Sequence, residues 1–106
     1  MTVGGSGGFE VVTAIAQVVV RSMIFNETIK EAIDAPRLFT ELSSNYTLYE
    51  ETFPQDLISE LTNVRHQDMR VVEESLGIVH GLKVEGGYIR GNCDFREGSS
   101  AFPAGF

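Results

Sequence analysis

Apolar positions are densest over residues 9–25, and their pattern predicts a long helix that is buried on most of its sides. Polar residues interrupt this stretch at helical spacing: Glu10, Thr13, Gln17 and Arg21. The many β-branched residues would also suit a strand, but the length and the i, i+4 spacing favour a helix. A helix this apolar needs partners on several faces, more than 106 residues readily offer. We therefore expect the chain to be part of a longer protein.

The rest of the pattern predicts short helices, with strands concentrated late in the chain. Residues 29–34 are predicted to form a short helix that stops before Pro36, because proline disfavours helical geometry in the preceding residue. Residues 53–64 are predicted to form another, with Pro54 near its first position. The predicted extended segments are 37–39, 46–49, 69–72, 76–84 and 88–93, the last two forming a hairpin across residues 85–87. This layout predicts an α/β (α+β) fold, with residues 1–106 as one partial domain.

Composition and charge exclude several classes of function. The net charge of −7 makes nucleic acid a poor partner, since an acidic surface repels a polyanion. The single cysteine, Cys93, cannot form an internal disulfide, and without a CxxC pair or a His/Cys cluster we expect no metal site and no cofactor. His66 and His80 lie in different segments and are interpreted as solvated or packed imidazoles. The most apolar stretch is too short and too interrupted to span a membrane.

Two N-glycosylation sequons lie in predicted surface connections: Asn26-Glu27-Thr28 and Asn45-Tyr46-Thr47. Their use requires passage through the secretory pathway, yet the first residues of the chain do not have the pattern of a signal peptide. If the sequons are used, the protein is secreted or displayed outside the cell, and its targeting signal lies upstream. This is a second reason to expect a longer protein.

A glycine-rich segment, residues 4–8, precedes the long helix and is the strongest candidate for a functional site. Residues with little or no side chain leave a row of backbone N–H groups at a helix start, where the dipole favours negative charge. Such a segment could bind phosphate, stabilise an oxyanion, or serve as a flexible linker. The glycine spacing does not fit a dinucleotide-binding turn, and Gly8 is followed by Phe9 where a P-loop needs lysine.

No nucleophile in the sequence stands close to a histidine that could act as its base. Cys93 and the serines have no histidine beside them along the chain, and the acidic pairs Glu50-Glu51 and Glu73-Glu74 are interpreted as solvated faces. The chain thus offers an oxyanion-type loop without an activated nucleophile, as expected for part of an enzyme.

Five motifs, in order along the chain, resemble the γ-glutamyltransferases, which are also called glutathione hydrolases. The motifs are Gly5-Ser-Gly-Gly8 before the apolar helix, Glu31-Ala-Ile-Asp-Ala-Pro-Arg-Leu38, Tyr49-Glu-Glu-Thr-Phe-Pro54, Cys93-Asp-Phe-Arg96 and Ala104-Gly-Phe106. The resemblance runs in register over nearly the whole chain and corresponds to the C-terminal part of the family's small subunit.

The resemblance implies the four-layer αββα sandwich of the N-terminal-nucleophile hydrolases, incomplete in this chain. The family transfers the γ-glutamyl group of glutathione to water, an amino acid or a dipeptide through an acyl-enzyme. In that scheme Gly7 and Gly8 match the glycine pair whose backbone N–H groups form the oxyanion hole and so contact the substrate. The catalytic threonine, the residues that grip the rest of the substrate, and the large subunit would all lie outside this chain. We therefore expect the chain alone to be inactive.

The resemblance also implies structural residues and reveals departures from the family pattern. Arg37 and Arg96 match arginines that the family uses in packing and maturation, where buried pairing with carboxylates suits a guanidinium. Asn45 sits where animal members often carry a sequon. The family usually has histidine after Pro-Arg-Leu and a terminal tyrosine, where this chain has Phe39 and Phe106. These departures indicate a divergent animal branch, in which the activity could be altered.

Three hypotheses follow for the function. The first is a fragment or truncated product of a γ-glutamyltransferase that is active only as part of the whole enzyme. The second is a truncated, inactive paralogue that acts as an interaction module. The third is an unrelated acidic α/β domain with a flexible glycine-rich start.

Overall fold

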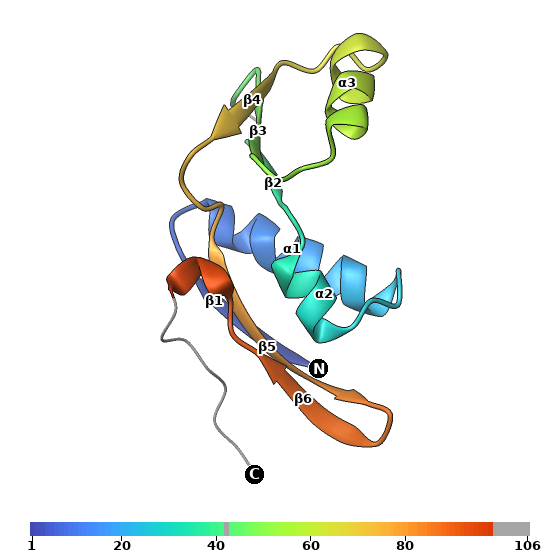
Figure 1. Cartoon of the computed structure of the whole chain (residues 1–106). Coiled ribbons are helices and arrows are strands. Elements are labelled where there is room, and N and C mark those ends of the chain that lie inside the picture. The colour runs from blue at the N-terminus through green and yellow to red at the C-terminus, as the bar shows by residue number, and fades with distance from the viewer. Residues whose placement is uncertain (42, 99–106) are drawn as a thin grey trace. The chain divides into compact units, whose positions relative to one another are not determined.

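The computed structural model describes residues 1–41 and 43–98, and the chain forms two compact units (Figure 1). The first unit combines Met1–Ala35 with the chain from Gly77 on, and the second is Pro36–Leu76. Helices and strands occur in both units, which agrees with the predicted mixed α/β class. The motif Ala104-Gly-Phe106 lies outside the described residues.

A three-stranded antiparallel sheet is the framework of the first unit, in the order β1 (Thr2–Ser6), β5 (Ile78–Glu85) and β6 (Tyr88–Asn92). Strands β5 and β6 form the predicted hairpin. Gly86 and Gly87 supply the positive φ angles of 57° and 83° that its tight turn needs. The strand that pairs with the other side of β5 comes from the opposite end of the sequence.

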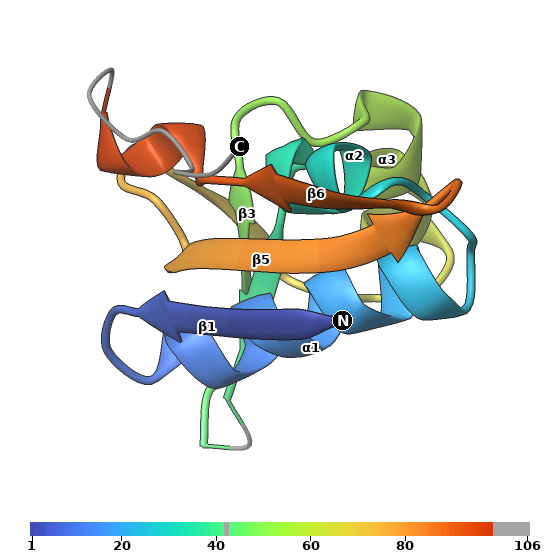
Figure 2. The same ribbon diagram turned by 90° about the horizontal axis from the view of Figure 1, so that it is seen from below.

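Helices α1 (Glu10–Met23) and α2 (Ile29–Asp34) belong to the same unit, and Figure 2 shows β1 and β5 in front of α1 and β6 in front of α2. The buried core that the helices share with the sheet consists of Ala14, Val18, Ile29, Ala32, Ile33 and Val79. A glycine in the middle of β5 makes this close packing feasible. A Cβ added at Gly81 would lie 2.9 Å from Ile29 Cδ1 and 3.0 Å from Val3 Cγ1.

Helix α1 is less buried than its apolar sequence predicts. Its fully buried side chains form one stripe at i, i+4 spacing: Ala14, Val18 and Ser22. Its exposed apolar side chains lie elsewhere around the helix: Phe9 at the N-cap, Val12, Val20 and Met23. The expectation of burial on most sides is therefore wrong for the residues that the structure describes: small residues bring one face close to its partners, Val11, Ile15 and Val19 are half-buried, and the side with Val12 and Val20 is exposed.

The second unit holds a small mixed sheet and one helix. Strand β2 (Leu38–Thr40) pairs antiparallel with β3 (Thr47–Glu50), and β3 pairs parallel with β4 (Met69–Val72). Helix α3 (Gln55–Asn63) provides the crossover that two parallel strands require, and Ile58 is its buried residue. All four elements lie close to their predicted ranges.

The glycine-rich segment 4–8 is only partly a loop, which corrects the sequence-based expectation. Its first three residues belong to β1 and pair with β5, and only the last two connect the strand to α1. A Cβ added at Gly5 would lie 2.5 Å from the Ile78 carbonyl oxygen and 2.9 Å from Val11 Cγ2. Glycine thus allows the strand to approach both β5 and α1, and this packing explains why residues of low strand propensity form a strand.

Thr28 starts helix α2 with a capping box. Its Oγ1 accepts a hydrogen bond from the Glu31 N–H at 3.1 Å, and Glu31 Oε1 accepts one from the Thr28 N–H at 3.2 Å. The hydrogen bond with the Thr28 side chain, and then the one with its backbone, lowers the pKa of Glu31 from its ordinary value of 4.5. A carboxyl group whose pKa is lower in the folded state stabilises the fold above its ordinary pKa, and this contribution is lost as the pH falls.

We expect Thr28→Ala to lower the free energy of unfolding by about 0.5–2 kcal/mol at neutral pH, because the cap is lost. Thr28→Ser keeps a hydroxyl at the same place and should retain most of the stability. Urea unfolding of both variants, made in bacterial cells so that no glycan is attached, measures the difference. Equal losses in the two variants would contradict a capping role for the hydroxyl.

Candidate active-site loop

Gly7 and Gly8, which we call the glycine turn, connect β1 to α1, and Gly7 lies against the backbone of another segment. Gly7 adopts a φ of 134°, where residues with side chains are strained, and a Cβ on it would lie 3.3 Å from the Gly77 Cα. Gly77 has a φ of 85°, and a Cβ on it would lie 3.1 Å from the Ala14 Cβ. Gly7 therefore backs onto Gly77, and Gly77 backs onto α1, which favours a fixed turn over a flexible linker.

Helix α1 begins at the glycine turn without a side-chain cap. Phe9 occupies the N-cap position and makes no capping hydrogen bond, and the Val11 N–H reaches the Gly8 carbonyl at 3.4 Å. Both glycines of the turn are exposed. The helix is 14 residues long, so its dipole adds positive potential at this end. Backbone N–H groups in such a place are able to donate to an oxyanion.

The Glu10 side chain lies beside the second glycine of the turn. A Cβ added at Gly8 would lie 2.8 Å from Glu10 Oε2. The helix dipole favours a carboxylate in the first turn, but the same carboxylate would repel an anion bound there. Because Oε2 is the far end of a flexible side chain, it can turn away when an oxyanion forms.

His80 and Cys93 lie far apart in the sequence but line the same hollow in the structure. The expectation that no histidine lies near this cysteine is therefore wrong. However, both nitrogens of the imidazole already have partners. Nδ1 accepts a hydrogen bond from the Asp94 N–H at 3.1 Å, and Nε2 donates one to Glu97 Oε2 at 2.7 Å. With both ring nitrogens bonded, His80 has none left to accept a proton from the Cys93 thiol. The two side chains line a hollow of about 410 Å³ together with Thr2, Val3, Gly4, Gly81, Leu82 and Asn92.

The Arg96 side chain is buried in the first unit and forms hydrogen bonds with the C-terminal end of α2. Its Nη1 donates to the Ile33 carbonyl and to Asp94 Oδ1, each at 2.9 Å, and its Nη2 donates to the Ala35 carbonyl at 2.9 Å. Asp94 also caps a short 3₁₀ helix, η1 (Phe95–Glu97), which the sequence pattern does not predict. The Arg96 guanidinium thus binds main chain and a carboxylate of its own unit.

Arg37 is buried at the start of the second unit. Its N–H donates to Glu50 Oε1 at 2.8 Å, and the Glu50 N–H donates to the Arg37 carbonyl at 3.1 Å. These bonds join the residue before β2 to the end of β3.

The asparagines of both sequons are exposed. Asn45 lies in the connection between β2 and β3, and Asn26 follows α1 with a φ of 58°. Exposure of the asparagine is a condition for its glycosylation, and both residues meet it.

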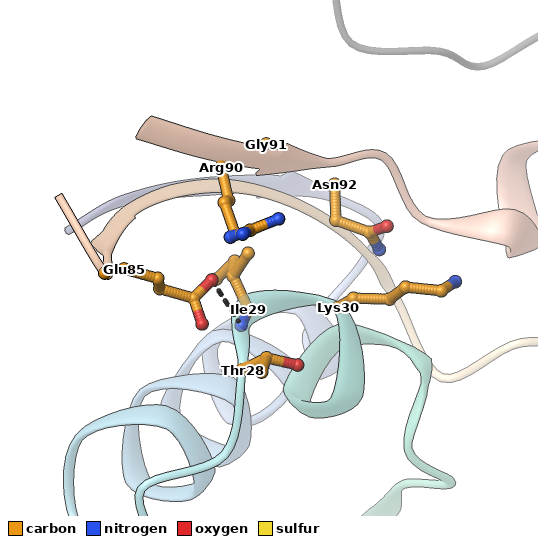
Figure 3. A pocket seen from close by; sticks show the side chains of 8 residues that line it. Thr28, Ile29, Lys30, Glu85, Arg90, Gly91 and Asn92 are labelled. Carbon is orange, nitrogen blue, oxygen red and sulfur yellow. Dashed lines mark hydrogen bonds between the residues drawn. The ribbon is translucent and has the colours of Figure 1, made fainter. Parts of the chain in front are cut away.

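A further hollow, of about 460 Å³, lies between the start of α2 and the β5–β6 hairpin (Figure 3). Glu85 Oε1 accepts from the Ile29 N–H at 3.3 Å within it, and the side chains of Arg90 and Lys30 reach it from the hairpin and the helix. Neither hollow is lined by the glycine turn.

Among the described residues, no group of three or more His, Cys, Asp or Glu side chains could hold a metal ion. In the same part of the chain, no helix has the length and apolar character needed to cross a membrane.

Comparison with known proteins shows which family and which structures this chain is similar to. Residues 1–104 match the family described as Gamma-glutamyltranspeptidase. Scoloptoxin SSD14 of Scolopendra dehaani is 30% identical over 100 residues, which cover 94% of this chain and 17% of that protein. The glutathione hydrolase proenzyme of Bacillus subtilis (strain 168) is 26% identical over 103 residues, which cover 95% of this chain and 17% of that protein. The gamma-glutamyltranspeptidase from Pseudomonas nitroreducens complexed with L-DON superposes with a TM-score of 0.81 at 19% identity, over 97% of this chain and 54% of that chain.

The fold is that of the N-terminal-nucleophile hydrolases, of which this chain contains a part. By sequence, the chain belongs to the γ-glutamyltranspeptidase family. The predicted family and fold class are therefore confirmed. The chain spans 17% of the length of the two curated relatives and 54% of the solved chain.

Proposed function

We propose that this chain is the C-terminal part of the small subunit of a γ-glutamyltransferase, or glutathione hydrolase, and supplies the oxyanion hole of the complete enzyme. The observation that carries this proposal is the glycine turn, where Gly7 backs onto Gly77 at the exposed and uncapped start of α1. Two adjacent residues without side chains leave room for a carbonyl oxygen to approach the backbone. A glutathione hydrolase among the relatives supports the class of reaction.

In the proposed reaction, a threonine from the rest of the small subunit attacks the γ-glutamyl carbonyl carbon. The electron pair of the carbonyl double bond moves onto its oxygen, and the backbone N–H groups of Gly7 and Gly8 donate to that oxygen. Because the negative charge is largest near the tetrahedral intermediate, fixed donors lower the barrier more than they strengthen substrate binding. When the intermediate collapses, the amide C–N bond breaks, the amine part of the substrate leaves with the electron pair and takes up the proton that the threonine lost, and an acyl-enzyme remains. Water, an amino acid or a dipeptide then attacks the acyl-enzyme, takes the γ-glutamyl group and returns a proton to the threonine.

The remaining parts of the enzyme would act as partners of this chain. The rest of the small subunit and the large subunit would complete the sandwich, and glutathione and other γ-glutamyl compounds would be the substrates. The proposed chemistry uses no cofactor. Arg37 and Arg96 are proposed as structural residues; the burial of Arg37 and of the Arg96 side chain, and their bonds within single units, support this role.

The proposed location is the extracellular face of the plasma membrane or the extracellular medium. Exposure of Asn26 and Asn45, each the first residue of a sequon, supports passage through the secretory pathway. Both are proposed as N-glycosylation sites.

The 106-residue chain alone is expected to show no turnover of a γ-glutamyl anilide. The chain would offer donors for an oxyanion but no nucleophile with a free base, since the imidazole beside Cys93 has both nitrogens bonded. Release of the anilide, followed by absorbance, measures the activity, with a complete bacterial γ-glutamyltransferase as the positive control. Turnover that persists in Cys93→Ala and Ser6→Ala variants would show that the chain carries a nucleophile of its own and would sink the proposal.

A second candidate function is a catalytically inactive paralogue that acts as an interaction module. The observation that favours it is the exposed apolar side of α1, which includes Phe9, Val12 and Val20. The genomic sequence upstream of Met1 separates the two candidates. A reading frame that encodes a threonine cleavage site supports the enzyme, and a stop codon immediately upstream supports the module.

A further inference from the structure

The C-terminal end of α1 exposes an apolar patch that the first unit leaves uncovered. Met23, Ile24 and Phe25 are 60%, 71% and 65% exposed, and Val20 is exposed one turn earlier. Single exposed apolar residues are common, but adjacent large ones usually mark a surface that something covers. We call these four residues the terminal patch.

Asn26 directly follows the terminal patch, and the main chain holds it there. On either side of it, the Phe25 N–H donates to the Val20 carbonyl and the Glu27 N–H to the Arg21 carbonyl, each at 3.1 Å. Asn26 itself is exposed, and its side-chain amide makes no hydrogen bond with any residue that the structure describes. The side-chain amide is therefore accessible to a glycosyltransferase.

Helix α3 ends in a turn of similar geometry, in which histidine takes the place of asparagine. His66 has a φ of 56°, close to the 58° of Asn26, and the N–H groups of Arg65 and Gln67 donate to helix carbonyls at 3.3 and 2.9 Å. Since histidine serves in this turn, the backbone geometry does not by itself demand asparagine. Of the two turns, the one at Asn26 has a threonine two residues later and three exposed apolar residues before it.

We propose that Asn26 carries an N-linked oligosaccharide whose first sugars cover the terminal patch. This inference rests on the secretory location proposed above. In the reaction, Asn26 Nδ2 bonds to the anomeric carbon of an oligosaccharide carried on a polyprenyl diphosphate. The bond from that carbon to the diphosphate oxygen breaks, the diphosphate leaves with the electron pair, and one amide proton passes to a base of the transferase. The C–H faces of the sugar rings then lie on apolar side chains while their hydroxyl groups face water.

The test compares the chain with its Asn26→Gly variant, each made behind a secretion leader in a glycosylating host and also in bacterial cells. Glycine tolerates the positive φ of this position, so the variant removes the acceptor and keeps the turn. Asn26→Asp, which is nearly isosteric, is a second variant in case the first does not fold. Intact mass before and after enzymatic glycan release, with mapping of the glycopeptides, reports the occupancy of Asn26 and Asn45. Fluorescence of an apolar dye and light scattering report exposure of the terminal patch.

We expect the secreted chain to lose the mass of one more glycan than the secreted Asn26→Gly variant. We also expect the secreted variant to bind at least twofold more dye than the secreted chain, and the two bacterial proteins to bind equal amounts. Occupancy of Asn45 with an empty Asn26 would overturn this inference alone, whereas two empty sequons would overturn it and also remove the support that the sequons give to the proposed location. An occupied Asn26 without a difference in dye binding, or a difference already present in the bacterial proteins, would refute the covering role.

Discussion

A valine at Gly7 is expected to lower kcat by about 10²–10³-fold, with little change in KM, when it is placed in a complete γ-glutamyltransferase that carries this segment. The structure gives two reasons. The φ of 134° is strained for any residue with a side chain and most of all for a β-branched one, and a Cβ would lie 3.3 Å from the Gly77 Cα. Relief of this strain would turn the Gly7 N–H away from the oxyanion, a loss of about 2.7–4 kcal/mol in the transition state.

Variants at the neighbouring positions provide the controls. Gly8→Val should also lower kcat, but Gly8→Ala should be milder than Gly7→Ala, because the atom nearest to a Cβ at Gly8 ends the flexible Glu10 side chain. Ser6→Ala should remain near the parent enzyme, since backbone donation does not need its hydroxyl. Steady-state kinetics are compared after a gel has shown that self-cleavage still occurs. An unchanged kcat in both valine variants would show that the glycine turn only connects the strand to the helix and does not donate to the oxyanion.

Local sequence features predicted the short elements well. Helix α2 has the predicted bounds because Thr28 caps its start and Pro36 stops it, and both act within a few residues. Two glycines with positive φ likewise explain why the β5–β6 hairpin was predictable. In each case the decisive residues lie inside or beside the element.

Strand β1 was not predictable in the same way, because its reason lies far along the chain. Its glycines have low strand propensity, and they form a strand because β5 supplies hydrogen bonds and α1 leaves no room for a side chain at Gly5. The pairing of His80 with Glu97 and its closeness to Cys93 likewise depend on the β5–β6 register and on η1. The candidate site was located by motif order and by resemblance, whereas the contact of Gly7 with Gly77 needed the fold.

The Arg96–Asp94 pair is the most buried charge pair that the structure shows in the first unit, with side chains 4% and 0% exposed. The guanidinium donates to the Ile33 and Ala35 carbonyls and to Asp94 Oδ1. Asp94 also accepts hydrogen bonds from the Arg96 N–H at 3.1 Å and the Val79 N–H at 2.8 Å. The carboxylate therefore links β5, η1 and, through Arg96, the end of α2. Removal of the guanidinium would leave a negative charge inside this junction without its cation.

We expect Arg96→Ala to lower the free energy of unfolding by about 3–5 kcal/mol, because a buried carboxylate then lacks compensation. Arg96→Lys should fall between the parent and Arg96→Ala, since an ammonium restores the charge but cannot reach the Ile33 and Ala35 carbonyls and Asp94 at once. The double variant Arg96→Ala with Asp94→Asn should be more stable than Arg96→Ala alone, because the amide removes the uncompensated charge while its oxygen still accepts from the Val79 N–H. Urea unfolding followed by circular dichroism measures all three. If the double variant is no more stable than the single one, the stabilisation comes from packing of the arginine side chain and not from its charge.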